Sequence, residues 1–178
     1  PAIALGMEPA EGNLMARKPR GKNSNFFSGG VMSSIIYQGI LEAATVLFVY
    51  WSAIKWPVHT ALNVNGLDAT QLYDLQHADA LTMAFVTLGL MQLFHAFNVK
   101  SVHQSLFKVG AFKNKTFNGA ILLSFVLMMG IIIIPGLNDI FKVTPLETSQ
   151  WLIVVGASFA IVPIVEVVKF IQRRMGKI

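Results

Sequence analysis

The chain has 178 residues, of which 54% are hydrophobic and 13% charged, with a formal net charge of +5 and no cysteine. A globular domain carries roughly a quarter charged residues, so this composition excludes an ordinary soluble protein. The lack of cysteine excludes disulfides and thiolate metal sites, and the basic residues follow no RNA- or DNA-binding pattern, which argues against a nucleic-acid partner.

Residues 1–30 precede the first long apolar block. Pro9, Gly12, Pro19 and Gly21 interrupt any long helix in this stretch, so we expect a loop. The start, Pro1-Ala2-Ile3, has neither an initiator methionine nor a signal peptide, which indicates a cut through a longer chain. We therefore separate residues 1–30 from residues 31–178, where the apolar blocks lie.

The first two apolar blocks are each long enough to cross a bilayer of about 30 Å. The first covers about residues 31–54, contains one charged residue, Glu42, and is closed by Pro57, which stops a helix. The second covers about residues 80–99, between Asp79 and Lys100, and contains no charge. Both blocks predict membrane-spanning helices.

The third and fourth blocks have the same character. The third covers about residues 116–137 and ends in the turn pair Pro135-Gly136. The fourth covers about residues 150–171 and places Glu166 and Lys169 three positions apart near its end, where we predict a water interface. The sequence thus predicts an all-α membrane protein with four transmembrane helices.

The basic residues predict the orientation of these helices. Most of them fall in three groups, namely Arg17, Lys18, Arg20 and Lys22, then Lys100, Lys108, Lys113 and Lys115, and finally Lys169, Arg173, Arg174 and Lys177. The other two connections hold only Lys55 and Lys142. Cytoplasmic loops carry the excess of lysine and arginine, so both termini and the middle connection are predicted to be cytoplasmic.

Residues 1–20, PAIALGMEPAEGNLMARKPR, resemble the segment that follows the sixth transmembrane helix in type II P-type ATPases. The matching positions are Pro1, Ala2, Ala4, Leu5, Gly6, Pro9, Met15, Arg17, Pro19 and Arg20. Two later stretches resemble helices eight and ten, namely Thr82-Met83-Ala84 with Asn98 and Gln150-Trp151-Leu152 with Glu166, Lys169, Phe170 and Ile171. The resemblance covers the whole chain and points to bacterial calcium pumps. It makes residues 1–30 the end of helix six and the cytoplasmic loop six-seven, and residues 31–178 helices seven to ten.

The resemblance implies that the chain is the C-terminal transmembrane part of an ATP-driven calcium export pump in the plasma membrane. In that family Ca²⁺ is the transported ion, and ATP with Mg²⁺ phosphorylates an aspartate in a DKTGT motif. This chain has no DKTGT motif, so it is expected to bind no such cofactor and to be inactive alone. Its expected partners are the lipid bilayer and the N-terminal part of the same pump, helices one to six and the phosphorylation domain. The alternatives are a P-type pump for sodium, potassium or magnesium, and a free-standing four-helix membrane binding or assembly protein.

Gln92 is a candidate metal position. It lies three positions before His95, so the two share one helical face. By resemblance, its position holds a glutamate that helps to bind a second calcium ion in sarcoplasmic-type pumps and a glutamine in plasma-membrane-type pumps, which move one ion per cycle. Gln92 is therefore expected to be a vestigial or supporting position that marks one calcium site. The alternative is an ordinary hydrogen bond between helices.

Glu42 is the only acidic residue in the middle of a predicted helix, with Gln38 one turn before it on the same face. A carboxyl group inside the membrane suggests ion or proton coupling. The alternative is a protonated glutamic acid that bonds to a neighbouring helix. Gly39, Ala43 and Ala44 form a small-residue face, which favours close approach of another helix.

Four residues of the first loop are candidates for coupling to the phosphorylation domain, which this loop contacts in the family: Glu8, Glu11, Arg17 and Arg20. Glu11 matches an acidic position of the family, whereas Asn13 replaces another acid. The alternative for these residues is a solvated loop of mixed charge.

Overall fold

The computed structural model describes residues 2–7, 25, 27, 31–56, 68–100, 110 and 113–174. All regular structure within these ranges is helical: α1 (Ala2–Leu5), α2 (Val31–Lys55), α3 (Ala69–Asn98), α5 (Lys115–Ile133), α6 (Leu137–Phe141), α7 (Thr148–Phe159) and α8 (Ile161–Arg174). Four segments are long and apolar enough to cross a membrane, namely α2, α3, α5 and the combined segment Thr148–Gln172. The predicted all-α fold with four transmembrane helices is confirmed.

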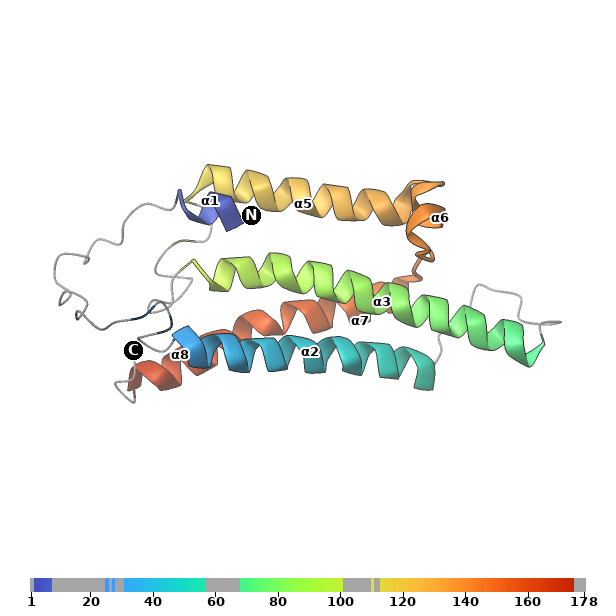
Figure 1. The fold of residues 1–178 in the computed structure, drawn as a ribbon, viewed down its shortest axis with the longest axis horizontal. Helices are drawn as coiled ribbons and strands as arrows, with labels where there is room; N and C mark the ends of the chain where they lie inside the picture. The colour runs from blue at the N-terminus through green and yellow to red at the C-terminus, as the bar shows by residue number, and fades with distance from the viewer. Residues whose placement is uncertain are drawn as a thin grey trace.

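Helix α3 occupies the middle of the bundle and packs against α2, α5, α7 and α8 (Figure 1). The main core cluster joins four helices through Val49 of α2, Met83 and Val86 of α3, Met128 of α5 and Val154 of α7. Helix α1 and the end of α8 lie at one end of the bundle, and α6 lies at the other (Figure 1). We call these the α1 end and the α6 end.

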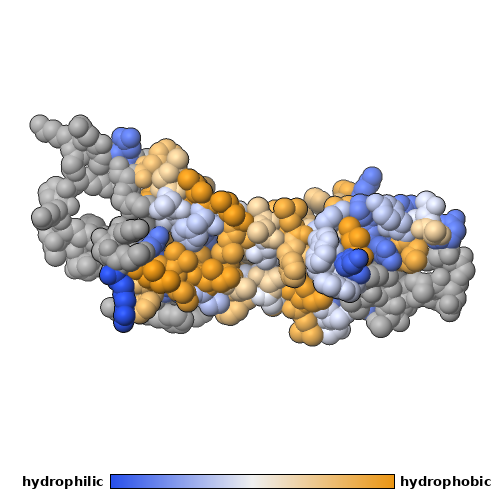
Figure 2. Space-filling model, turned by 90° about the horizontal axis from the view of Figure 1, so that it is seen from below, coloured by the Kyte–Doolittle hydropathy of each residue, from blue (hydrophilic) through white to orange (hydrophobic). Residues whose placement is uncertain are grey.

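The outward surface of the bundle is apolar along its middle. Ile40 and Leu47 of α2 are 65% and 66% exposed, and Leu122 and Leu127 of α5 are each 62% exposed. Figure 2 shows apolar residues over the central part of the long axis and polar residues toward both ends. Such a surface is stable in hydrocarbon and not in water.

Helix α3 begins at Ala69, eleven residues before its predicted start near residue 80. Asp68 caps its N-terminus, because the backbone N–H of Gln71 donates to Asp68 Oδ1 (2.8 Å) and the Asp68 N–H donates to Gln71 Oε1 (3.2 Å). This capping box satisfies two backbone donors at the new start. The polar segment up to Asp79, which the apolar pattern placed in a connection, is therefore the first part of the same helix.

Two prolines explain the ends of the later helices. Helix α5 ends at Ile133 rather than near residue 137, because the residue before Pro135 is disfavoured in the helical conformation. The last span is divided at Ala160 into α7 and α8. Pro163 has no N–H and its ring clashes with the carbonyl four residues earlier, which accounts for this break.

Candidate functional site

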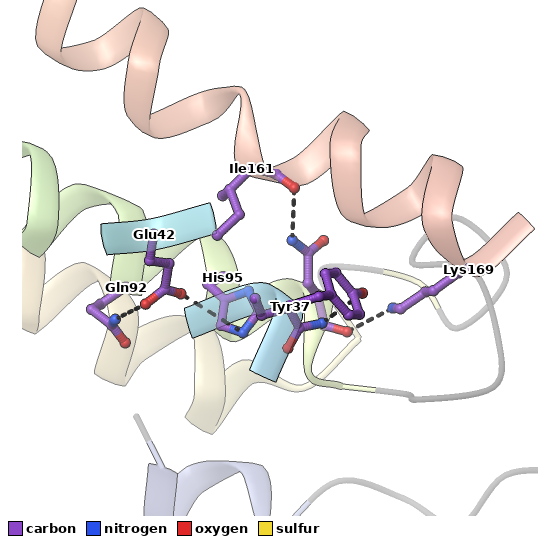
Figure 3. Close-up of polar contacts among 8 residues, drawn as sticks. Tyr37, Glu42, Gln92, His95, Ile161 and Lys169 are labelled. Atoms are coloured by element: carbon purple, nitrogen blue, oxygen red, sulfur yellow. Dashed lines mark hydrogen bonds and ion pairs between the residues drawn. The ribbon is translucent and has the colours of Figure 1, made fainter. Parts of the chain in front are cut away.

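Glu42 forms a polar contact between α2 and α3 in the middle of the apolar bundle (Figure 3). Gln92 Nε2 donates to Glu42 Oε2 at 2.7 Å, and His95 Nε2 lies 3.9 Å from Glu42 Oε1. The side chains of Glu42 and His95 are only 15% and 13% exposed. Both residues that sequence spacing placed on one face of α3 therefore meet the same carboxyl group.

Gln38 does not take part in this contact, although it lies one turn before Glu42. Its Nε2 donates to the hydroxyl oxygen of Tyr37 at 3.0 Å. Gly39, Ala43 and Ala44 are exposed, and the position of a Cβ on Gly39 has no atom within 4 Å. The small-residue face of α2 is thus open toward the outside of the described bundle.

A second polar group joins α3 to α8 near the α1 end (Figure 3). Lys169 Nζ donates to the backbone oxygen of Asn98 at 2.7 Å and lies 3.6 Å from Glu166 Oε1, while Asn98 Nδ2 donates to the backbone oxygen of Ile161 at 3.4 Å. Lys169 is only 4% exposed. Lys169 is thus buried against protein, and its ammonium group bonds to the C-terminal end of α3, where carbonyls lack helical partners.

A third polar group lies toward the α6 end and has no counterpart in the sequence-based predictions. Asp79 is 6% exposed. Thr144 Oγ1 donates to Asp79 Oδ1 at 2.7 Å, and Gln150 Nε2 donates to Asp79 Oδ2 at 3.3 Å. The backbone N–H of Thr144 also donates to Thr82 Oγ1 at 2.9 Å. This group ties the segment before α7 to α3.

The described residues contain no group of three or more His, Cys, Asp or Glu side chains placed to hold a metal ion. Among the described residues, Gln92 donates to one carboxylate, that of Glu42. Calcium usually takes six to eight oxygen ligands, so this pair would supply only a small part of such a site. The loop candidates Glu8, Glu11, Arg17 and Arg20 lie outside the described residues.

Comparison of the sequence with known proteins shows which family this chain matches. Residues 1–171 match the family described as cation transporting ATPase, C-terminus. The chain is 34% identical over 178 residues to a calcium-transporting ATPase of Listeria monocytogenes, an alignment that covers 99% of this chain and 18% of that protein. It is 31% identical to calcium-transporting ATPase 1 of Bacillus cereus, over 97% of this chain and 19% of that protein. It is 24% identical to human calcium-transporting ATPase type 2C member 1, over 100% of this chain and 18% of that protein. The chain thus spans less than a fifth of the length of these three relatives.

Proposed function

The chain belongs to the cation transporting ATPase C-terminus family, and we propose that it forms the last four transmembrane helices of an ATP-driven calcium export pump. The match over residues 1–171 carries this proposal. It is supported by the calcium-transporting ATPases among the relatives and by four helices that are long and apolar enough to span a membrane. Calcium is then the transported ion, and ATP with Mg²⁺ is used elsewhere in the pump.

In this proposal the chain anchors and supports the helices that bind the ion. Contacts from α3 to α2, α5, α7 and α8 make one bundle, and polar contacts join α3 to α2, to α8 and to the segment before α7. The exposed small-residue face of α2 leaves room for another helix of the same pump. Residues 1–30 couple the bundle to the phosphorylation domain through Glu8, Glu11, Arg17 and Arg20.

Gln92 is proposed to support the bundle rather than to bind a second calcium ion. Its amide group donates to Glu42 at 2.7 Å, and a hydrogen bond between helices is a sufficient reason for a polar side chain in an apolar helix. Glu42 is accordingly proposed to hold α2 and α3 together. The alternative is ion or proton coupling through Glu42. Mutation of Glu42 distinguishes this coupling from the structural role.

The pump is proposed to lie in the plasma membrane with the α1 end of the bundle in the cytoplasm. The basic residues described at that end, Lys100, Lys113 and Lys115, support this orientation under the positive-inside rule. Both chain termini would then be cytoplasmic, with the start of α3 and the whole of α6 on the outside.

Single cysteines test this orientation. Thr70 at the start of α3 and Lys113 before α5 are both exposed and lie at opposite ends of the bundle. In a cysteine-free full-length pump, we expect Thr70→Cys to react with a membrane-impermeant maleimide in intact cells and Lys113→Cys to react only after permeabilisation. The reverse pattern would contradict the proposed topology.

Ion uptake tests the function itself. We expect the full-length pump, reconstituted in sealed vesicles, to accumulate calcium when ATP is added, and to lose this activity when ATP is omitted. The chain of 178 residues alone should release no phosphate from ATP, because it has no DKTGT motif. Turnover of the full-length pump that is independent of calcium but stimulated by sodium, potassium or magnesium would assign it to another ion.

A further inference from the structure

A large apolar cavity lies between α3, α5 and α7 toward the α6 end of the bundle. Its volume is about 710 Å³, within the range of about 300–1,000 Å³ that is common for small-molecule sites. Leu90 and Phe94 of α3, Phe125 and Met129 of α5, and Trp151 of α7 line it, with Asn138 of α6 at one end. None of these residues belongs to the Glu42 or Asp79 contacts.

The packing of α3 and α5 explains why a cavity forms here. The two helices touch at Gly89, where a Cβ would lie only 2.5 Å from Met128 Sδ. Next to this contact, Leu90 and Met129 line the cavity instead of filling it. Phe94 packs edge-on against Phe159 of α7, with ring centroids 5.6 Å apart, and so stays on the α3–α7 side of the cavity.

Along α5, the cavity is confined to the half of the helix that is nearer the α6 end. Along α5 its lining runs from Phe125 to Ile133, a step of eight residues that measures about 12 Å at 1.5 Å per residue. Half of a hydrocarbon core of about 30 Å is about 15 Å. The atoms that line an empty cavity lose dispersion contacts. Inside the hydrocarbon core, the surrounding molecules that can fill the cavity are hydrocarbon chains.

The polar lining groups are gathered at the α6 end. Asn138 Oδ1 accepts from the backbone N–H groups of Gly136 (3.1 Å) and Asp139 (2.9 Å), which holds its carboxamide at the end of α5. Trp151 is near the start of α7, and tryptophan favours the headgroup level of a membrane. The cavity therefore has apolar walls inside the leaflet and polar groups where a headgroup would lie.

We propose that this cavity binds one acyl chain of a phospholipid from the leaflet at the α6 end, with its headgroup beside Asn138 and Trp151. The length of the α5 lining, which is close to that of one leaflet, and the placement of polar groups at one end only favour a tethered lipid over a free hydrophobic solute. The inference depends on the membrane-spanning fold and holds whichever cation the pump transports.

Photocrosslinking tests this site in the full-length pump. The pump is placed in nanodiscs of phosphatidylcholine that carries a diazirine in the middle of one acyl chain, and labelled peptides are identified by mass spectrometry. We expect labelling at Leu90 and Met129. Met129→Trp should fill the cavity and lower this labelling by about five-fold, which corresponds to roughly 1 kcal/mol. Leu123→Trp is the matched control, because Leu123 is on the same helix but 60% exposed, and it should leave the labelling at Leu90 unchanged.

Three results would overturn the proposal. First, the cavity residues could be labelled no more strongly than residues on the outward face of α5, as expected if another helix of the pump fills the cavity. Met129→Trp, once confirmed as folded by gel filtration, could leave the labelling unchanged. If Met129→Trp does not fold, Val155→Trp on the α7 wall of the cavity is used in its place. Finally, a hydrocarbon diazirine without a headgroup, at the same concentration in the membrane, could label the cavity equally well, which would refute a phospholipid.

Discussion

Vesicles that contain the full-length pump are expected to take up one calcium ion for each ATP hydrolysed. The reason is the chemistry of Gln92. A carboxylate brings a negative charge and can bind calcium through both oxygens, whereas a carboxamide offers one neutral oxygen. The amide nitrogen of Gln92 donates to Glu42 at 2.7 Å, so this side chain contributes to a contact between helices. Calcium uptake and phosphate release, measured in the same vesicles, determine the ratio.

A substitution at the same position sharpens this test. Gln92→Glu replaces the hydrogen bond to Glu42 with two neighbouring carboxyl groups, which repel each other when both are charged. We expect the apparent calcium affinity to change while the ratio stays at one ion per ATP. Gln38→Glu is the control, because it adds a carboxyl group one turn from Glu42 at a side chain that bonds Tyr37. Two calcium ions per ATP in the unmodified pump would refute the assignment of Gln92.

The apolar blocks predicted the number and type of spanning helices because hydrocarbon leaves the chain few choices. Every backbone group must be bonded within the segment, so a long apolar run has to be helical. That constraint ends at the membrane surface. Beyond it, the first part of α3 forms on the capping contacts of Asp68 with Gln71, and hydropathy does not register such contacts. The early start of α3 was therefore missed.

The contacts within the site were predictable only along one helix. Spacing placed Gln92 and His95 on one face of α3, but the partner on α2 depends on how the two helices rotate and slide against each other, which the sequence alone does not determine. The same limit applies to Lys169, because spacing along one helix does not predict its bond to the end of α3. Asp79 was treated as a boundary, because its partners Thr144 and Gln150 are more than sixty positions away.

Asp79 should therefore be the residue whose loss most weakens the α6 end of the bundle. Its carboxyl group is buried and accepts from both Thr144 Oγ1 and Gln150 Nε2. A hydrogen bond to a charged group contributes more than a neutral one, and a buried donor left without its acceptor is costly, so Asp79→Ala is expected to lower stability by about 3 kcal/mol. The segment between α6 and α7 should loosen first, because Thr144 lies within it.

Thermal unfolding of the purified full-length pump in detergent measures this effect, and Asp74→Ala provides the matched control. Asp74 is on the same helix as Asp79 but is exposed, so removing its carboxyl group should leave the unfolding midpoint nearly unchanged. Asp79→Asn keeps one acceptor oxygen and should fall between the two alanine variants. If Asp79→Ala and Asp74→Ala unfolded at the same temperature, the buried contacts of Asp79 would contribute nothing to the stability of the bundle, and the proposed link between α3 and α7 would be wrong.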